Sequence, residues 1–295
     1  MKNFFFNSLI NTQHHTQHHT QHHKKNITKN VNILHFHGNH NLGDIMFNFI
    51  VFYNIKNFIE SRNTTIYFYM RSEHIHQMKD FNPIKNMKIF DISKKPANSI
   101  ELWDCNDYIF EKNGKKNDNS VIFSGLPQNI YYIKYFNKKL KYLNIPITIN
   151  HFSYEDDDIL KRYVNLDNKY KNIDILFINS DAMSGQYTYD NLEWENIINL
   201  LNHKFKIVTT KKINNVLSTR DDNLCIKDIA AISINVKVVI SINTGVFTPL
   251  LNIYTLKNVN KFYMFDNRTY WSYDKFESKK YLTDISFDEL SAYIN

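Results

Sequence analysis

A short stretch near residue 40 combines the residue types that acid–base chemistry needs. Residues 35–44 read HFHGNHNLGD, between a predicted strand and a predicted helix. Gly43 permits a tight turn there, and Asp44 follows it in the first turn of the helix. The helix dipole favours a carboxylate at this place, so Asp44 either caps the helix or, where its surroundings raise its pKa, acts as a general base. Of the nearby histidines, His40 is the best candidate for contacting a substrate.

A second stretch, SINTGVFT over residues 241–248, also joins a predicted strand to a predicted helix. Free backbone N–H groups at a helix start bind phosphate well. The predicted phosphate loop consists of Asn243, Thr244, Gly245, Val246 and Phe247. The alternative interpretation is that Asn243 or Thr244 is an ordinary N-cap.

Two further strand ends carry polar residues. Ser180 lies in a small polar stretch after the predicted strand 173–179, and it is a candidate for lining the same site. Lys211 follows the predicted strand 205–210, where it either holds a phosphate or is a solvated surface residue. Asp228 stands at a predicted helix start, where it caps that helix or contacts a ribose.

The histidines allow a metal interpretation, which the spacing does not favour. No Cys or carboxylate stands at a familiar zinc spacing from His35, His37 and His40, so we expect cleft-lining or packed side chains and no metal site. Six more histidines occur in residues 12–23, which are three copies of Thr-Gln-His-His. This low-complexity tract predicts a disordered tail over residues 1–30, with metal chelation as the less favoured alternative.

Glycine is scarce in this chain, with 6 in 295 residues. Such a chain keeps glycine mainly where backbone geometry demands it. Five of the six follow predicted strand ends: Gly38, Gly43, Gly125, Gly185 and Gly245. Ligands bind at this edge of an α/β sheet, although a tight turn alone also explains a glycine there.

Short β-rich runs alternate with longer amphipathic runs along the chain. The predicted strands are 31–37, 65–70, 87–92, a weaker 107–110, 120–124, 173–179, 205–210, 236–242 and 261–265. The predicted helices are 45–59, 128–143, 191–201, 226–233, 245–255 and 284–294. Strand–helix alternation favours parallel sheets, and two successive runs of it predict an α/β protein with two Rossmann-like domains facing across a cleft.

The predicted division follows from a break in this rhythm. Ile145-Pro146 and the acidic turn 155–158 mark a boundary near residue 150. We therefore expect a tail over 1–30, an N-terminal Rossmann-like acceptor-side domain over 31–150, and a C-terminal donor or nucleotide-binding domain over 151–295.

Composition narrows the function classes. The chain is 43% hydrophobic without an apolar run of 18 residues, so no transmembrane helix is expected. The start is too polar for a signal peptide, and two distant cysteines, Cys105 and Cys225, suit a reducing cytoplasmic location. The net charge is +7, but the first 30 residues hold four lysines and no acid, so the rest is nearly balanced. Nucleic-acid binding is therefore not favoured.

A Gly-Asp pair that opens a long helix after a strand resembles the start of GT-B glycosyltransferases, specifically the heptosyltransferase-like family 9. Residues 227–232 and 238–245 are similar to that family's donor-side helix, strand and Thr-Gly phosphate loop. The family often has Asp where Asn243 stands, and His where Phe247 or Thr248 falls. The resemblance implies Asp44 as catalytic base, a nucleotide-sugar donor, a glycan or small-molecule acceptor, and no separate cofactor.

Two other functions stay open at this point. The sequence NHNLGD over residues 39–44 also resembles the Asn-x-Gly-Asp opening of polysaccharide pyruvyl transferases, which use phosphoenolpyruvate. The second alternative is a non-catalytic GT-B-like binding protein, with the histidine-rich tail as a tether. A cleft with neither a base nor a phosphate loop would favour this last interpretation.

Overall fold

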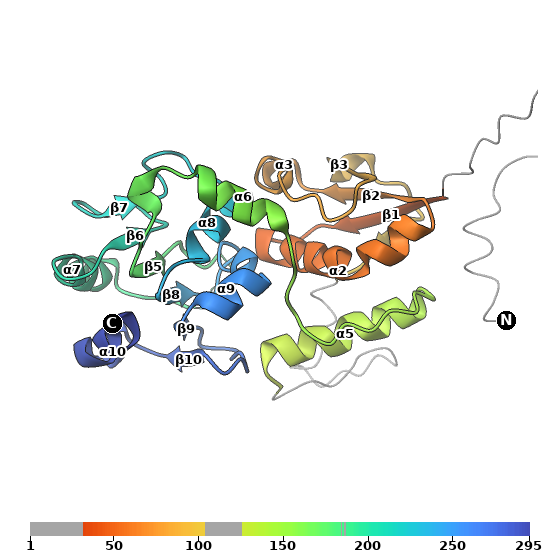
Figure 1. Ribbon diagram of the computed structural model, residues 1–295. Coiled ribbons are helices and arrows are strands. Elements are labelled where there is room, and N and C mark those ends of the chain that lie inside the picture. The colour runs from red at the N-terminus through yellow and green to blue at the C-terminus, as the bar shows by residue number, and fades with distance from the viewer. Residues whose placement is uncertain (1–31, 104–125, 184, 186) are drawn as a thin grey trace, which may run out of the picture.

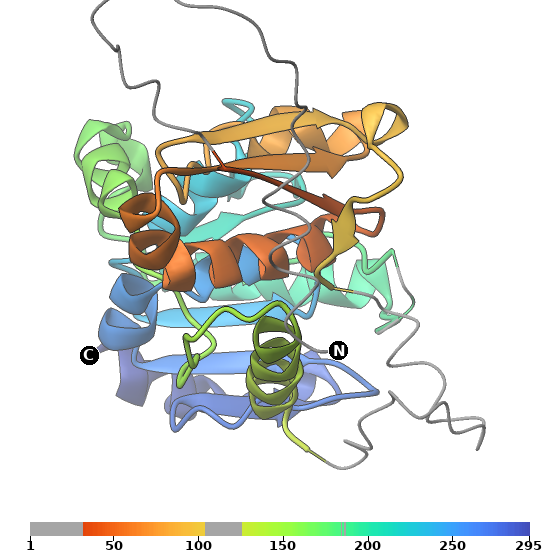
Figure 2. The ribbon, with the colours of Figure 1, turned by 90° about the vertical axis from the view of Figure 1, so that its right-hand side faces the viewer.

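The computed structural model describes residues 32–103, 126–183, 185 and 187–295. The predicted tail, the predicted strands 107–110 and 120–124, Cys105 and Gly125 lie outside the described residues. Figure 1 shows two groups of strands side by side, the N-terminal group in orange and yellow and the C-terminal group in green to blue. Figure 2 shows the strands of both groups running across the view, one group above the other.

The N-terminal sheet has four parallel strands in the order β3-β2-β1-β4. Its strands are β1 (Asn32–Gly38), β2 (Thr64–Met70), β3 (Met87–Asp91) and β4 (Ile100–Glu101). Its helices are α2 (Leu42–Ser61), α3 (Ser72–Met78) and α5 (Gln128–Tyr142), with a 3₁₀ turn at Ile92–Lys94. The predicted strands 31–37, 65–70 and 87–92 and the helices 45–59 and 128–143 are confirmed within a few residues.

The C-terminal sheet has six parallel strands in the order β10-β9-β8-β5-β6-β7. Its strands are β5 (Ile175–Ile178), β6 (Ile207–Thr209), β7 (Leu217–Ser218), β8 (Val238–Ile242), β9 (Lys261–Phe265) and β10 (Phe276–Lys279). Its helices are α6 (Asp157–Asn165), α7 (Asn191–Asn202), α8 (Ile226–Ser233), α9 (Ile253–Asn258) and α10 (Phe287–Ile294), with 3₁₀ turns at Asn168–Tyr170, Thr248–Leu250 and Leu282–Asp284. Two parallel sheets confirm the predicted α/β class.

The position of helix α2 explains why its sequence is apolar on all sides. Eleven of its side chains are buried, among them Phe49 and Phe52, both fully buried. It contacts β2 on one side and the 3₁₀ turn after β8 on the other. A helix with apolar residues on all sides is stable only where protein surrounds it. Here the helix that begins at the candidate catalytic stretch lies between the two halves of the molecule.

The strands of the C-terminal sheet send alternate side chains to two cores. In β5, Leu176 and Ile178 join the core that also contains the N-terminal sheet, while Ile175 and Phe177 join a second core under α7 and α10. This follows from the two-residue period of a strand. The first core is one apolar cluster that runs from β2 through α2 to α8 and β9.

Two predictions about local structure are wrong. The predicted helix 245–255 is a turn followed by the 3₁₀ turn Thr248–Leu250, and α9 begins only at Ile253. Pro249 favours this interruption because it has no backbone N–H to donate. The predicted acidic turn 155–158 instead starts α6, with Asp156 as its N-cap.

Other boundary predictions agree with the structure. Strand β9 and helix α8 have the predicted limits, and Ser286 accepts a hydrogen bond from the backbone N–H of Glu289 at 3.0 Å, as the capping spacing predicts. The helices of the described ranges include none with the length and apolarity to cross a bilayer.

Candidate active site

Asp44 lies in the first turn of α2. The N-cap residue Asn41 donates its backbone N–H to the Asp44 carboxylate, and the indole Nε1 of Trp103 donates to Oδ1 at 2.9 Å. Burial raises the pKa of Asp44, although these two bonds and the nearby charge of His40 act to lower it. The Asp44 carboxylate therefore accepts a hydrogen bond from the N-cap residue of its own helix. Its pKa is also shifted upward, which is the direction that a general base needs.

Alternate residues around β4 contact the end of β1, the loop that follows it and the start of α2. Ser99 Oγ lies 3.0 Å from His37 Nδ1, and Glu101 Oε1 lies 3.1 Å from His40 Nε2. Trp103, two positions further, holds the catalytic candidate. Side chains at every second position of an extended segment share one face. These three residues were not among the candidates predicted from the sequence, because a strand of two residues is too short to show that their side chains share a face.

The histidines of β1 differ in their surroundings. The Glu101 carboxylate lies between His40 and His37, whose Nε2 is 3.9 Å away, and the hydrogen bond from His40 lowers the pKa of Glu101. His35 instead packs on Tyr69, with Nδ1 2.9 Å from the tyrosine hydroxyl, and burial lowers its pKa. In the described ranges, no three His, Cys, Asp or Glu side chains are grouped as metal ligands.

Two of the predicted glycine turns, about 200 residues apart in the sequence, contact each other. A Cβ placed on Gly245 would lie 2.8 Å from the backbone nitrogen of Gly43, and a Cβ on Gly43 would lie 3.1 Å from Gly245 Cα. Only glycine allows two backbones to approach this closely. The contact places the helix start that carries Asp44 against the loop that follows β8.

The substitution Gly245→Ala should therefore destabilise the protein by about 1–3 kcal/mol, the usual range for overpacking. The new methyl group would meet backbone, which cannot move aside as a flexible side chain can. Gly38→Ala is the matched control, because the three atoms nearest to its Cβ would all belong to side chains, those of Asn48 and Phe68 at 3.3 Å and that of Ile45 at 3.8 Å. Urea unfolding measures both variants, and a smaller loss for Gly245→Ala than for Gly38→Ala would contradict the backbone contact.

The side chain of Asn243 belongs to a hydrogen-bond network. Its Nδ2 donates to Gln128 Oε1 at 3.0 Å and to Asp266 Oδ2 at 2.6 Å. The Thr269 hydroxyl oxygen lies within hydrogen-bond distance of the same two acceptors, at 2.8 and 2.6 Å, and can donate to one of them at a time. Asn243 is not an N-cap, because the next helical turn, Thr248–Leu250, has Phe247 as its N-cap. The Asn243 amide instead joins the end of β8 to the start of α5 and to the loop after β9.

Of the other residues in the predicted phosphate loop, some pack in the core and one is a candidate for contacting a ligand. The Phe247 ring is fully buried against Trp271, and its backbone N–H donates to the Thr244 carbonyl at 3.0 Å. Val246 is half-buried beside the same core. By contrast, the Thr244 hydroxyl is buried and has no hydrogen-bond partner among the described residues. Unsatisfied buried hydroxyls are uncommon, so this one is a candidate contact for a ligand oxygen.

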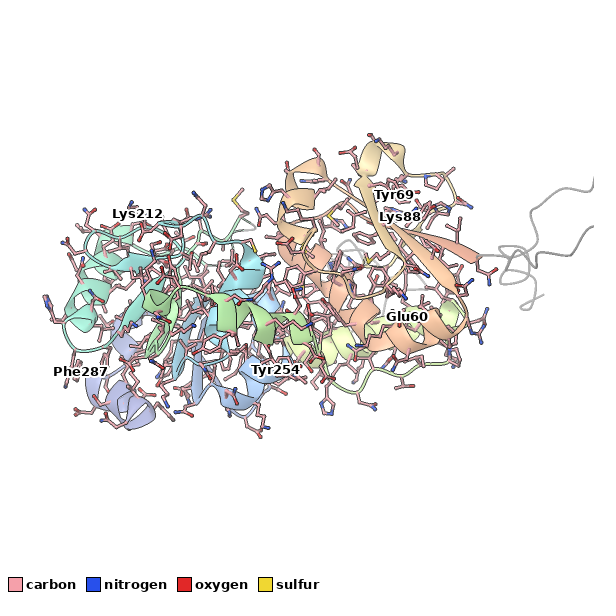
Figure 3. The ribbon with its side chains drawn as sticks, turned by 45° about the horizontal axis from the view of Figure 1, so that its top comes forward. Glu60, Tyr69, Lys88, Lys212, Tyr254 and Phe287 are labelled. Atoms are coloured by element: carbon pink, nitrogen blue, oxygen red, sulfur yellow. The ribbon has the colours of Figure 1, made fainter. Side chains whose placement is uncertain are left out.

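Ser180 and Lys211 lie on neighbouring strand ends. Ser180 Oγ is 2.9 Å from Thr210 Oγ1, and the Lys211 ammonium donates to Asp181 at 3.1 Å and to Asn191 at 2.8 Å. A phosphate at Lys211 would have to compete with this carboxylate. Lys212, on the surface of the C-terminal half (Figure 3), pairs with Asp221 at 3.3 Å and is 72% exposed.

Asp228 caps its helix, which was one of the two interpretations of this residue. Its Oδ2 accepts from the Cys225 backbone N–H at 3.0 Å, and its Oδ1 accepts from Arg162 at 2.8 Å. Both oxygens thus have protein partners.

The preceding residue, Lys227, forms a buried ionic cluster that the sequence analysis did not predict. Its side chain is 2% exposed, and Nζ lies 2.9 Å from the nearest oxygens of both Asp156 and Asp158. The same ammonium donates to the Asp80 carbonyl at 2.8 Å, and the Tyr53 hydroxyl donates to Asp156. The cluster thereby joins α2 and the end of α3 to α6 and α8.

Comparison with family models finds no match, and comparison with curated proteins finds no significant one. Solved structures do match. The glycosyl transferase family 9 protein of Veillonella parvula has 9% identity and a TM-score of 0.53, covering 89% of this chain and 90% of its own. Escherichia coli heptosyltransferase WaaC with ADP-2-deoxy-2-fluoro heptose has 10% identity and a TM-score of 0.54, covering 89% and 98%. The chain has a GT-B-like glycosyltransferase fold.

A third structure extends this result. Escherichia coli ADP-heptose lipopolysaccharide heptosyltransferase II has 9% identity and a TM-score of 0.52, over 89% of this chain and 98% of its own. The GT-B-like fold thus extends over nearly the whole described chain, and the fold expected from the resemblance is confirmed. At this identity the likeness concerns the fold.

Proposed function

We propose that this protein is a glycosyltransferase that moves a sugar from a nucleotide-sugar donor to an acceptor hydroxyl. The observation that carries the proposal is the position of Asp44, a half-buried carboxylate with a raised pKa, one residue from the Gly43–Gly245 contact. That contact sets the candidate base beside the Thr244–Gly245 loop of the C-terminal half. A base on one side and a phosphate-binding loop on the other are the two parts that this reaction needs.

In the proposed reaction, Asp44 accepts the proton of the acceptor hydroxyl as its oxygen attacks the anomeric carbon of the donor. The bond between that carbon and the diphosphate oxygen breaks, and the nucleoside diphosphate leaves with the bonding electron pair. Trp103 and Asn41 hold the carboxylate in place and leave it further lone pairs with which to take the proton. Burial, which makes the ionised form less stable, makes Asp44 a stronger base than an exposed aspartate.

The proposed donor site lies at the carboxyl ends of β5, β6 and β8. The Thr244 hydroxyl supplies a buried group without a protein partner, and Ser180 and Lys211 lie on the neighbouring strand ends. Such groups stabilise the charge that develops on a departing diphosphate. Because solved structures of Escherichia coli heptosyltransferase WaaC are described with ADP and with ADP-2-deoxy-2-fluoro heptose, adenine nucleotides are the first donors to test.

A thermal-shift panel tests this proposal on the full chain. The panel holds nucleoside diphosphates, their sugar conjugates and phosphoenolpyruvate. Stabilisation by one nucleotide family supports glycosyl transfer, since a ligand at a hundred times its Kd adds about 2.7 kcal/mol. Stabilisation by phosphoenolpyruvate alone would favour pyruvyl transfer, and no stabilisation would favour a non-catalytic binding protein.

The hydrogen bond from Trp103 to Asp44 predicts a change in the pH–rate profile when Trp103 is replaced. Its hydrogen bond lowers the pKa of Asp44, so Trp103→Phe should raise that pKa further and move the acidic limb of the pH–rate profile to higher pH. Phenylalanine keeps most of the ring packing against Phe47 and Tyr135. A profile that keeps its acidic limb, or moves it to lower pH, would show that this bond does not tune the base.

A further inference from the structure

A small pocket opens at the carboxyl edge of the C-terminal sheet, outside the residues used above. Its volume is about 260 Å³. Three chain segments form it: residues 187–194, from the end of the β5 loop into α7; Asn267 after β9; and residues 280–282 after β10. Because β9 and β10 follow β8 in the sheet order, the pocket lies on the same edge as the Thr244–Gly245 loop. Strands are spaced by about 4.8 Å, so two strands separate the β8 and β10 ends by about 10 Å.

The base of the pocket is formed mainly by packed aromatic rings. Tyr187, Trp194 and Leu282 are buried there. The Tyr189 ring lies 4.6 Å from the Trp194 ring and is stacked at 6.1 Å on the Tyr187 ring. These rings pack on one another, so they leave no slot between two parallel faces for a flat heterocycle.

The rim of the pocket carries polar side chains that are free for a ligand. Glu193, Asn267 and Lys280 are exposed, and their side chains make no hydrogen bond or ion pair with any residue that the structure describes. Together they offer a carboxylate acceptor, an amide that both donates and accepts, and an ammonium donor. Tyr281 completes the rim with a ring that is 61% exposed.

We propose that this pocket binds one sugar residue of a glycan. A pyranose ring has an apolar C–H face that packs on an aromatic ring, here Tyr281, and hydroxyls that both donate and accept, which the rim groups match. A phosphate ligand suits the pocket less, because Asp190 and Glu193 oppose the single charge of Lys280. The inference rests on the proposed function in one respect: the sugar would belong to the acceptor glycan, away from the reacting hydroxyl.

Saturation-transfer NMR with free monosaccharides tests the binding on the full chain. The probes are a hexose, a heptose and an N-acetylhexosamine, each without nucleotide. Tyr281→Ala should weaken binding of the best probe at least tenfold, and Glu193→Gln should weaken it severalfold. Tyr142→Ala is the matched control, since that tyrosine is 76% exposed at the end of α5 and away from the pocket, and it should leave binding unchanged.

Three outcomes of these measurements decide whether the pocket binds a sugar. Loss of binding in both pocket variants, with Tm and nucleotide binding retained, supports the sugar site. Equal binding in the wild type and both variants overturns it, as does the absence of binding by every probe at 10 mM or below, about 2.7 kcal/mol of affinity. This measurement needs neither a donor nor turnover. If the protein binds the sugar but shows no transferase activity, the sugar site is supported and only the proposed function is contradicted.

Discussion

Asp44→Asn should abolish glycosyl transfer and leave the fold and nucleotide binding intact. The asparagine amide cannot accept the proton of an acceptor hydroxyl, and a positioned general base contributes about 10²–10⁴ in rate. The fold should survive because Trp103 can still donate to the amide oxygen. The measurements are turnover with the nucleotide sugar that the thermal-shift panel identifies, Kd for its nucleoside diphosphate, and Tm.

Asp91→Asn is the matched control for this experiment. Asp91 also ends a strand of the N-terminal sheet, but it is half-exposed and caps the 3₁₀ turn Ile92–Lys94. Its replacement should leave turnover unchanged. If Asp44→Asn retains more than about a tenth of the wild-type kcat, the assignment of the base is wrong, since a general base supplies at least ~10²-fold.

Of the substitutions proposed for this protein, Lys227→Met should lower the free energy of unfolding most, by about 3–5 kcal/mol. Methionine fills much of the same space, but it leaves the carboxylates of Asp156 and Asp158 facing each other without the ammonium that lies 2.9 Å from each. The substitution leaves the charge of Asp156, whose side chain is 11% exposed, uncompensated, and this accounts for the size of the effect. The more exposed Asp158 keeps its ion pair with Arg162. Urea unfolding gives the free energy of unfolding directly.

Lys212→Met provides the comparison for a surface ion pair. Lys212 is 72% exposed, and such pairs contribute about 0–1 kcal/mol, so its loss should be small. Equal losses for the two lysine variants would mean that the cluster around Lys227 does not hold α6 and α8 to the N-terminal half.

The parts of the fold that the sequence predicts well are those with a strong local pattern. Helix α8 and strand β9 have their predicted limits because each is a short, mostly apolar run. The positions of the two candidate loops were also predicted, from scarce glycines at strand ends. Their contact was not predicted, because nothing in a local pattern states that Gly43 and Gly245 pack backbone against backbone.

The features that were predicted wrongly or not at all depend on contacts between segments that are distant in the sequence. The stretch 245–255 has a helical pattern, yet Phe247 is buried in the core and Pro249 interrupts the helix, so tertiary packing decides its conformation. Strand β4 has two residues, too short for a pattern to reveal it, although it carries Glu101 and precedes Trp103. The partners of Lys227 lie about 70 to 150 residues away in the sequence.

The single apolar cluster that runs from β2 through α2 to β9 also determines how the protein comes apart. Neither half can expose its share of this cluster without also exposing the share of the other half, although the second core under α7 and α10 belongs to the C-terminal half alone. The two halves are therefore one cooperative unit in the thermodynamic sense. A nucleotide bound to the C-terminal sheet would then slow amide exchange in β1 and β2 as well, because opening either region requires the same global event.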